Sequence, residues 1–224
     1  MKPITMAIGL EEGKVTPDSE FNDPGTISIG GYNIHNAEEK TYGQSSMYKV
    51  LEQSINTGVI YVERQVGNEA YRDYMKRFGF GEKSGIELPA ELPGDIRSLE
   101  RTKQDIQFYT ASFGQGITTT PIQMVQAYGA MANHGVLMRP QIIRRIQYAD
   151  GRVEEREPER IRQVLGEKAS EDIGKMLRTV VTKGHGKRAD VPGYLVGGKT
   201  GTAQVAKSGS AGYEEGITIG SFVG

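Results

Sequence analysis

The C-terminal end of the chain limits its possible folds more than any other segment. Residues 194–205 and 217–223 are rich in β-branched side chains and are punctuated by glycine. β-Branched residues favour the pleated backbone of a strand. We therefore predict two antiparallel strands, joined by a loop rich in Ser and Gly at 207–212. The fold must combine this strand pair with whatever the preceding residues form.

Apolar periodicity predicts a helix at the start of the chain and a helical middle region. Residues 3–10 indicate a helix that opens without a capping residue and ends at Gly13. Ser45 or Ser46 can cap a second helix, which ends near Gln53. A further apolar run follows at 59–66.

Three more helices are expected from their boundary residues. Asn68 can cap one that is stopped by Gly79. The sequence Thr-Pro-Ile-Gln at 120–123 has a capping threonine, a proline at the first helical position and a glutamine that can reach back. Ser170 is expected to cap the last helix, which Gly184 closes.

The segments between these helices contain turn signals. Residues 14–44 are rich in Gly, Asn, Asp, Ser and Thr, which predicts short strands, with a small hairpin at Gly30-Gly31. A long polar connection is expected at 79–107. Asp150-Gly151 lies between two β-prone runs and predicts a second hairpin.

Composition narrows the class of protein. The chain has 224 residues, enough for one substantial domain, with 37% hydrophobic and 25% charged residues. A net charge of −1 gives no reason to expect a nucleic-acid partner. The absence of cysteine excludes disulfides, zinc–thiolate sites and thiol nucleophiles; it suits an extracytoplasmic protein, and many cytosolic proteins share it. No apolar run is long enough to span a bilayer, and the start does not read as a signal peptide, so any anchor is expected outside this chain.

The segment 197–204, Gly-Gly-Lys-Thr-Gly-Thr-Ala-Gln, is the strongest chemical signal. A Lys-Thr-Gly triplet alone is common, and an exposed lysine in a turn is the simpler interpretation. Here the triplet lies inside a predicted strand, where we expect its glycines to leave one face of the backbone open to a ligand. Lys199 offers positive charge, and Thr200 and Thr202 offer hydroxyls for a carboxylate. This pattern suits recognition of an acidic peptide end along a strand edge.

A second candidate is Ser54-Ile55-Asn56, which ends an amphipathic stretch. Ser and Asn at such a place are usually capping residues. Lys2, near the start, would by itself be a solvated lysine. The order and separation of the three elements give them meaning: a lysine, then Ser-x-Asn about fifty residues later, then Lys-Thr-Gly.

This order resembles that of the penicillin-recognising serine acyltransferases, whose motifs are Ser-x-x-Lys, Ser-x-Asn and Lys-Thr-Gly. The chain is most similar to the transpeptidase domain of class B penicillin-binding proteins, and the similarity covers nearly all of it. The segments that carry the resemblance, besides the motifs, are 2–5, 42–58, 78–81, 85–89, 111–117, 120–123 and 220–224.

The resemblance implies a reaction and assigns a role to each residue near the first two motifs. A serine three residues before Lys2 would attack the penultimate D-alanine carbonyl of a peptidoglycan stem peptide. Lys2 would take the serine's proton, and Ser54 would relay a proton to the leaving D-alanine. Asn56 would hold Lys2 and the substrate amide in register.

The third motif would bind the substrate. Lys199 would add positive charge, and Thr200 and Thr202 would bind the terminal carboxylate, with Gly201 between them. The backbone N–H of Thr202 would form half of an oxyanion hole. No metal and no organic cofactor is implied.

The fold implied by the resemblance is α/β (α+β): an antiparallel sheet backed by helices, with an all-helical lobe that bears Ser-x-Asn and a cleft between the two. Residues 1–224 would be one partial transpeptidase domain, without the serine and without the final strand and helix. The chain alone is therefore expected to be inactive, to take no penicillin adduct and to expose a sheet edge beside 217–223.

The implied partners are stem peptides, β-lactam antibiotics and, through the parent protein, a cell-wall glycosyltransferase complex, but no nucleic acid. The implied location is the extracytoplasmic face of the bacterial cell membrane, with a role in cell shape or division. A serine β-lactamase, a non-catalytic penicillin-binding scaffold or sensor, and an unrelated binding protein are the alternatives.

Overall fold

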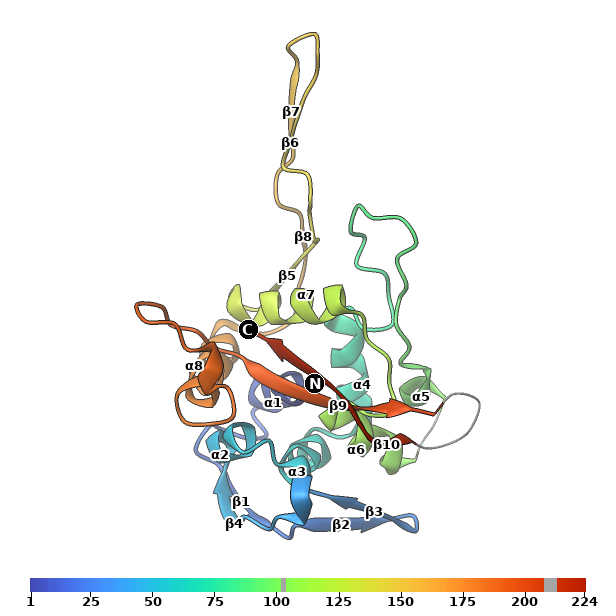
Figure 1. Cartoon of the computed structure of the whole chain (residues 1–224), viewed down its shortest axis with the longest axis vertical. Helices are drawn as coiled ribbons and strands as arrows, with labels where there is room; N and C mark the ends of the chain where they lie inside the picture. The colour runs from blue at the N-terminus through green and yellow to red at the C-terminus, as the bar shows by residue number, and fades with distance from the viewer. Residues whose placement is uncertain (102–103, 208–212) are drawn as a thin grey trace.

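Every strand pair that the structure describes is antiparallel. The structure, a computed structural model, describes residues 1–101, 104–207 and 213–224. Helices occupy the centre, two small strand pairs lie along one end, a long ribbon leaves the other end, and the C-terminal strand pair crosses the helices (Figure 1). This arrangement is the mixed α/β fold that the sequence predicts.

Helix α1 (Lys2–Glu11) forms the centre of the core. Its residues from Pro3 to Gly9 are all buried, so the helix is apolar on every side, as expected for a helix surrounded by others. It packs against α3 (Asn56–Val66), α6 (Asp105–Phe113) and α8 (Glu167–Thr182). Gly9 permits the contact with α3, because a Cβ there would lie 2.4 Å from Cγ1 of Val62.

Two strand pairs lie on the outer side of α3. Strand β1 (Glu20–Asp23) pairs with β4 (Gly43–Ser46), and β2 (Thr26–Ile29) pairs with β3 (Tyr32–His35). Gly30 and Gly31 both have positive φ, as a two-residue hairpin turn requires. The predicted short strands and the predicted hairpin are confirmed. A 3₁₀ turn, η1 (Ala37–Glu39), follows β3.

The helices before and after α3 begin with different kinds of N-cap residue. Ser46 caps α2 (Met47–Glu52) by accepting the Lys49 N–H, and this helix ends at Gln53 as predicted. The predicted cap at Asn68 is wrong: α4 (Asn68–Arg77) begins one residue earlier than expected, after Gly67. The Asn68 side chain instead donates to Asp105 at 2.8 Å.

The predicted connection at 79–107 is too long. Helix α5 (Arg97–Glu100) lies within it, and α6 begins at its end. Helix α6 ends at Gly114, whose φ of +100° is left-handed. Its buried side chains, among them Phe108 and Ala111, pack against α3. Its short apolar pattern gives no clear helical period, so burial by neighbouring helices determines its structure.

Helix α7 (Pro121–Ala132) starts at the predicted capping box, in which Thr120 and Gln123 bond reciprocally. A ribbon follows, formed by β5 (Val136–Met138) with β8 (Arg160–Gln163) and β6 (Arg145–Gln147) with β7 (Val153–Glu155). The ribbon extends away from the helices (Figure 1). Its tip contains Gly151 with φ +87°, which confirms the predicted second hairpin.

The predicted cap at Ser170 is wrong. Helix α8 begins at Glu167 after Gly166, so Ser170 lies within its first turns. Its hydroxyl is buried and donates to the Met131 carbonyl at 2.5 Å, which joins α8 to α7. The helix ends just before Gly184, as predicted, and a 3₁₀ turn, η2 (Lys187–Ala189), follows.

The C-terminal strands are β9 (Lys199–Ala206) and β10 (Tyr213–Val223), which pair antiparallel as predicted. The first begins at Lys199, later than the sequence suggested. The predicted loop at 207–212 lies, except for its first residue, outside the described residues. The pair packs against α8 and α7. Among the described residues, no helix is long and apolar enough to cross a bilayer.

Candidate functional site

Lys2 and Ser54 form the centre of the candidate site. Lys2 is the first residue of α1, and Ser54 lies in the turn between α2 and α3. The Lys2 Nζ donates to the Ser54 Oγ at 2.7 Å and to the Ser54 carbonyl oxygen at 2.5 Å. The structure therefore brings together two predicted residues that are 52 positions apart in the chain.

Lys199 lies close enough for its charge to act on Lys2. It is the first residue of β9, is 5% exposed, and its Nζ contacts the carbonyl oxygen and Oγ1 of Thr200 at 3.1 and 3.3 Å. Burial lowers the pKa of Lys2 to about 7, and the positive charge of Lys199 acts in the same direction. Burial also lowers the pKa of Lys199 to about 8. Two lysines thus share a site that disfavours two positive charges.

Asn56 lies two residues after Ser54, at the start of α3. Its Nδ2 donates to the His35 carbonyl oxygen at 2.8 Å, which directs the amide nitrogen towards the end of β3. No described hydrogen bond joins Asn56 to Lys2. The predicted role of Asn56 in holding Lys2 therefore stays a prediction.

The glycines of the third motif serve a different purpose from the predicted one. A Cβ at Gly198 would lie 2.3 Å from Cζ of Phe222, and a Cβ at Gly201 would lie 2.5 Å from Oγ of Ser221. Side chains of β10 thus occupy the space that was expected to be open to a ligand, so that expectation is wrong at these two positions. Along β9, Thr202 and Ala203 are exposed, while Thr200 is half-buried.

A buried polar network that the sequence did not predict lies beside the Ser-x-Asn turn. Asp23, Asn36 and Thr57 are all at most 4% exposed and are joined by hydrogen bonds. Asp23 precedes Pro24-Gly25, so its sequence context indicates an ordinary turn. No local signal could have found this network, because its members come together only in the fold.

A second missed network supports α1. The Thr5 hydroxyl donates to the Ser112 carbonyl oxygen at 2.8 Å and contacts the Tyr71 hydroxyl at 3.2 Å. These three residues are fully buried and join α1 to α6 and α4. A lone threonine in an otherwise apolar stretch was the available signal, because a buried hydroxyl needs a partner.

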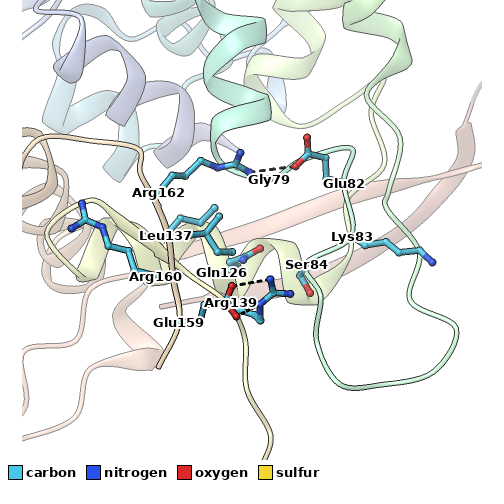
Figure 2. A pocket seen from close by; sticks show the side chains of 11 residues that line it. Gly79, Glu82, Lys83, Ser84, Gln126, Leu137, Arg139, Glu159, Arg160 and Arg162 are labelled. Atoms are coloured by element: carbon cyan, nitrogen blue, oxygen red, sulfur yellow. Dashed lines mark hydrogen bonds and ion pairs between the residues drawn. The ribbon is translucent and has the colours of Figure 1, made fainter. Parts of the chain in front are cut away.

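One surface pocket lies away from these residues. It has a volume of about 310 Å³ at the base of the ribbon and contains none of the predicted site residues. Figure 2 shows that its central charges are paired, Arg139 with Glu159 and Arg162 with Glu82, while Lys83 extends away from them. The pocket is therefore a polar junction between the ribbon and the loop after α4. Within the described residues, no cluster of acidic or histidine side chains could hold a metal ion.

Comparison with known proteins identifies the family. The family described as the penicillin binding protein transpeptidase domain matches residues 1–224. Stage V sporulation protein D of Bacillus subtilis is 38% identical over 228 residues, covering 100% of this chain and 34% of the relative. Peptidoglycan D,D-transpeptidase MrdA of Acinetobacter baumannii is 30% identical over 218 residues, covering 92% of this chain and 32% of the relative.

A solved structure matches equally well. The crystal structure of penicillin-binding protein 3 from Mycobacterium tuberculosis complexed with ampicillin superposes with a TM-score of 0.91 at 32% identity. It matches 99% of this chain, which covers 50% of the crystallised one. This chain therefore belongs to the penicillin-binding protein transpeptidase domain family, and its fold class is as predicted. The chain spans about a third of the length of its curated relatives.

Proposed function

We propose that the protein containing this chain is a peptidoglycan D,D-transpeptidase that acts through an acyl-serine intermediate. The observation that carries the proposal is the contact of Lys2 Nζ with Ser54 Oγ at 2.7 Å, in a site where the pKa of Lys2 falls to about 7. A lysine with this pKa is partly unprotonated at neutral pH and can accept a proton. Membership of the transpeptidase family supports the choice of reaction.

The reaction proceeds by transfer of one acyl group. Lys2 accepts the proton of a serine hydroxyl that precedes it, and the serine oxygen attacks the penultimate D-alanine carbonyl carbon. The bond between this carbonyl and the last D-alanine breaks, and Ser54 passes its proton to the leaving amine and receives the proton that Lys2 took from the serine. An amine of a neighbouring stem peptide then attacks the ester and loses a proton through Ser54 and Lys2 to the departing serine oxygen, which forms the cross-link and frees the serine.

The third motif binds the acidic end of the substrate. Lys199 contributes positive charge from the start of β9, and the hydroxyls of Thr200 and Thr202 hold the terminal carboxylate. The Thr202 N–H stabilises the oxyanion that forms at the attacked carbonyl. Gly201 separates the two threonines, which places them on the same face of the strand.

The substrate implies the partners and the location. Stem peptides are the substrate, and β-lactams occupy the same site as substrate mimics; a relative with the same fold is crystallised with ampicillin. We place the protein on the extracytoplasmic face of the bacterial cell membrane, where stem peptides are joined. A glycosyltransferase complex that makes the glycan strands is the proposed partner.

Labelling of the full-length protein with a fluorescent penicillin tests this function. The wild type is expected to take one stable covalent label, and Lys2→Ala is expected to lose it. Lys14→Ala, at an exposed lysine after α1, is the matched control and should label normally. Rapid release of the label would indicate a β-lactamase, and a wild type that takes no label would refute the acyl-serine mechanism.

A further inference from the structure

The helix that begins with Asn56 has no cap from its own sequence. Its N-cap residue, Ile55, makes no side-chain hydrogen bond. The first N–H groups of a helix need acceptors from elsewhere. Asn36, 21 residues earlier than Thr57, provides one, because its Oδ1 accepts the Thr57 N–H at 3.1 Å. The start of α3 is therefore capped across the fold.

Asp23 holds this capping residue in place. Its carboxylate is 2% exposed and accepts from the Asn36 Nδ2 at 2.9 and 3.1 Å, from the Gly25 N–H at 2.9 Å and from the Tyr42 N–H at 2.7 Å. The Thr57 hydroxyl also donates to it. Burial alone would raise the pKa of Asp23, but the hydrogen bonds, led by that of Thr57, hold it below its ordinary value. The ionised carboxylate also suits the positive end of α3.

The same network borders the Ser-x-Asn turn. His35, whose carbonyl oxygen accepts the Asn56 amide, directly precedes Asn36. Ser54 has a φ of +58°, a conformation that a residue other than glycine keeps only where its surroundings enforce it. The surroundings here are the Lys2 Nζ, which bonds the Ser54 hydroxyl and carbonyl oxygen, and the buried Ile55 with the capped start of α3, which directly follow Ser54.

We propose that Asp23 is a positioning residue for Ser54 and Asn56: it fixes Asn36 and Thr57, and through them the first turn of α3. The inference rests on the proposed function, because it concerns how well Ser54 and Asn56 face Lys2. Asp23 acts through its neighbours, and its carboxylate is fully engaged by them. An Asp23→Asn change keeps the shape but places an NH₂ group against donors that need an acceptor.

A double-mutant cycle on the full-length protein tests this role. The measured quantity is the second-order rate constant of acylation by a fluorescent penicillin. Asp23→Asn is expected to lower it about a hundredfold, as a small misplacement of catalytic groups does. In a background that carries both Ser54→Ala and Asn56→Ala, the same change should alter the residual rate by no more than about twofold, because both groups that Asp23 positions are gone. Equal effects of Asp23→Asn in both backgrounds would overturn the proposal.

Two controls separate positioning from general stability. Asp18→Asn makes the same chemical change at an exposed residue before β1 and should leave the rate within about twofold of the wild type. If Asp23→Asn does not fold, Thr57→Val and Thr57→Ser replace it. The serine variant keeps the donor to Asp23 and should retain the rate, while the valine variant should lose it. Equal rates for these two variants would contradict the proposal.

Crystal structures of the wild type and of Asp23→Asn provide a readout that does not depend on activity. The variant is expected to lose the hydrogen bond between Asn56 and His35 and to shift the start of α3. An unshifted Asn56 would overturn the inference even if the wild type labels. If the wild type takes no label but Asp23→Asn shows this shift, the proposed function is refuted and the positioning role is supported.

Discussion

Glu63 makes the stability of this domain depend on pH. It lies on α3, is 0% exposed, and neither carboxylate oxygen has a hydrogen-bond partner in the described structure. Burial raises the pKa of Glu63 from its ordinary value of 4.5 to about 8, and the charge of Asp105 adds to this, while Arg64 opposes it. The folded state therefore holds a proton on Glu63 at neutral pH, whereas the unfolded chain does not.

The sign and size of the effect follow from these two pKa values. The stabilising contribution of protonated Glu63 is fully present below pH 4.5 and is lost as the pH rises through about 8. Each unit between the two values corresponds to about 1.4 kcal/mol, so the full loss is roughly 5 kcal/mol. This is a large part of the roughly 5–15 kcal/mol by which ordinary domains are stable.

Replacement of Glu63 by glutamine removes its pH-dependent contribution to stability, so comparison with the wild type measures that contribution. We expect the free energy of unfolding of Glu63→Gln, minus that of the wild type, to rise by about 1.4 kcal/mol per pH unit between pH 5 and about 7.5. Any constant cost of burying the amide cancels in this slope. The measurement is urea unfolding at a series of pH values, with Glu157→Gln, at an exposed glutamate, as the matched control. A flat difference across this range would show that Glu63 is ionised in the folded protein and would refute the reasoning.

Three further predictions follow from the site and the core. Lys199→Met should raise the pKa of Lys2 above about 7 and so raise the pH at which penicillin acylation becomes fast. Lys199→Arg keeps the charge and should leave that pH unchanged, and acylation rates measured against pH distinguish the two outcomes. Gln123→Ala should destabilise the protein by about 2–3 kcal/mol, because the buried amide donates to the carbonyl oxygens of Gly79, Glu82 and Pro93. An unchanged midpoint of thermal unfolding would contradict this prediction. Gly58→Ala should cost about 1–3 kcal/mol, since its Cβ would lie 2.5 Å from a methyl carbon of Val50, and unaltered stability in urea would contradict the close packing of α2 on α3.

Local signals predicted those parts of the fold that local interactions determine. Thr120 and Gln123 form the predicted capping box because both of its hydrogen bonds lie within one helical turn. The prediction of the Gly30-Gly31 hairpin is confirmed for the same reason, because the turn depends on its own two residues. Ser170 has the sequence appearance of a cap, but its hydroxyl is used in a buried contact with α7, and Gly166 is the N-cap residue instead. Tertiary packing therefore overrides capping preference at this position.

Some residues of the candidate site could be predicted from the sequence, and others could not. The separation of the motifs identified Lys2, Ser54 and Lys199, and the fold brings Lys2 against Ser54. Asp23 and Glu63 escaped notice because nothing near them in sequence distinguishes them from a turn residue and a surface glutamate. Their burial and their partners, or lack of partners, arise from segments that are distant in the chain.

The central claim is that Lys2 acts as a base whose pKa the site lowers. The most direct measurement is the pH dependence of penicillin acylation of the full-length protein, from pH 5.5 to 9, for the wild type and Lys2→Arg. The wild-type rate should rise with pH and reach half its maximum near pH 7, as Lys2 loses its proton. Lys2→Arg, which keeps the positive charge but stays protonated, should not react. A wild-type rate that does not change with pH, or a reactive Lys2→Arg protein, would contradict the account.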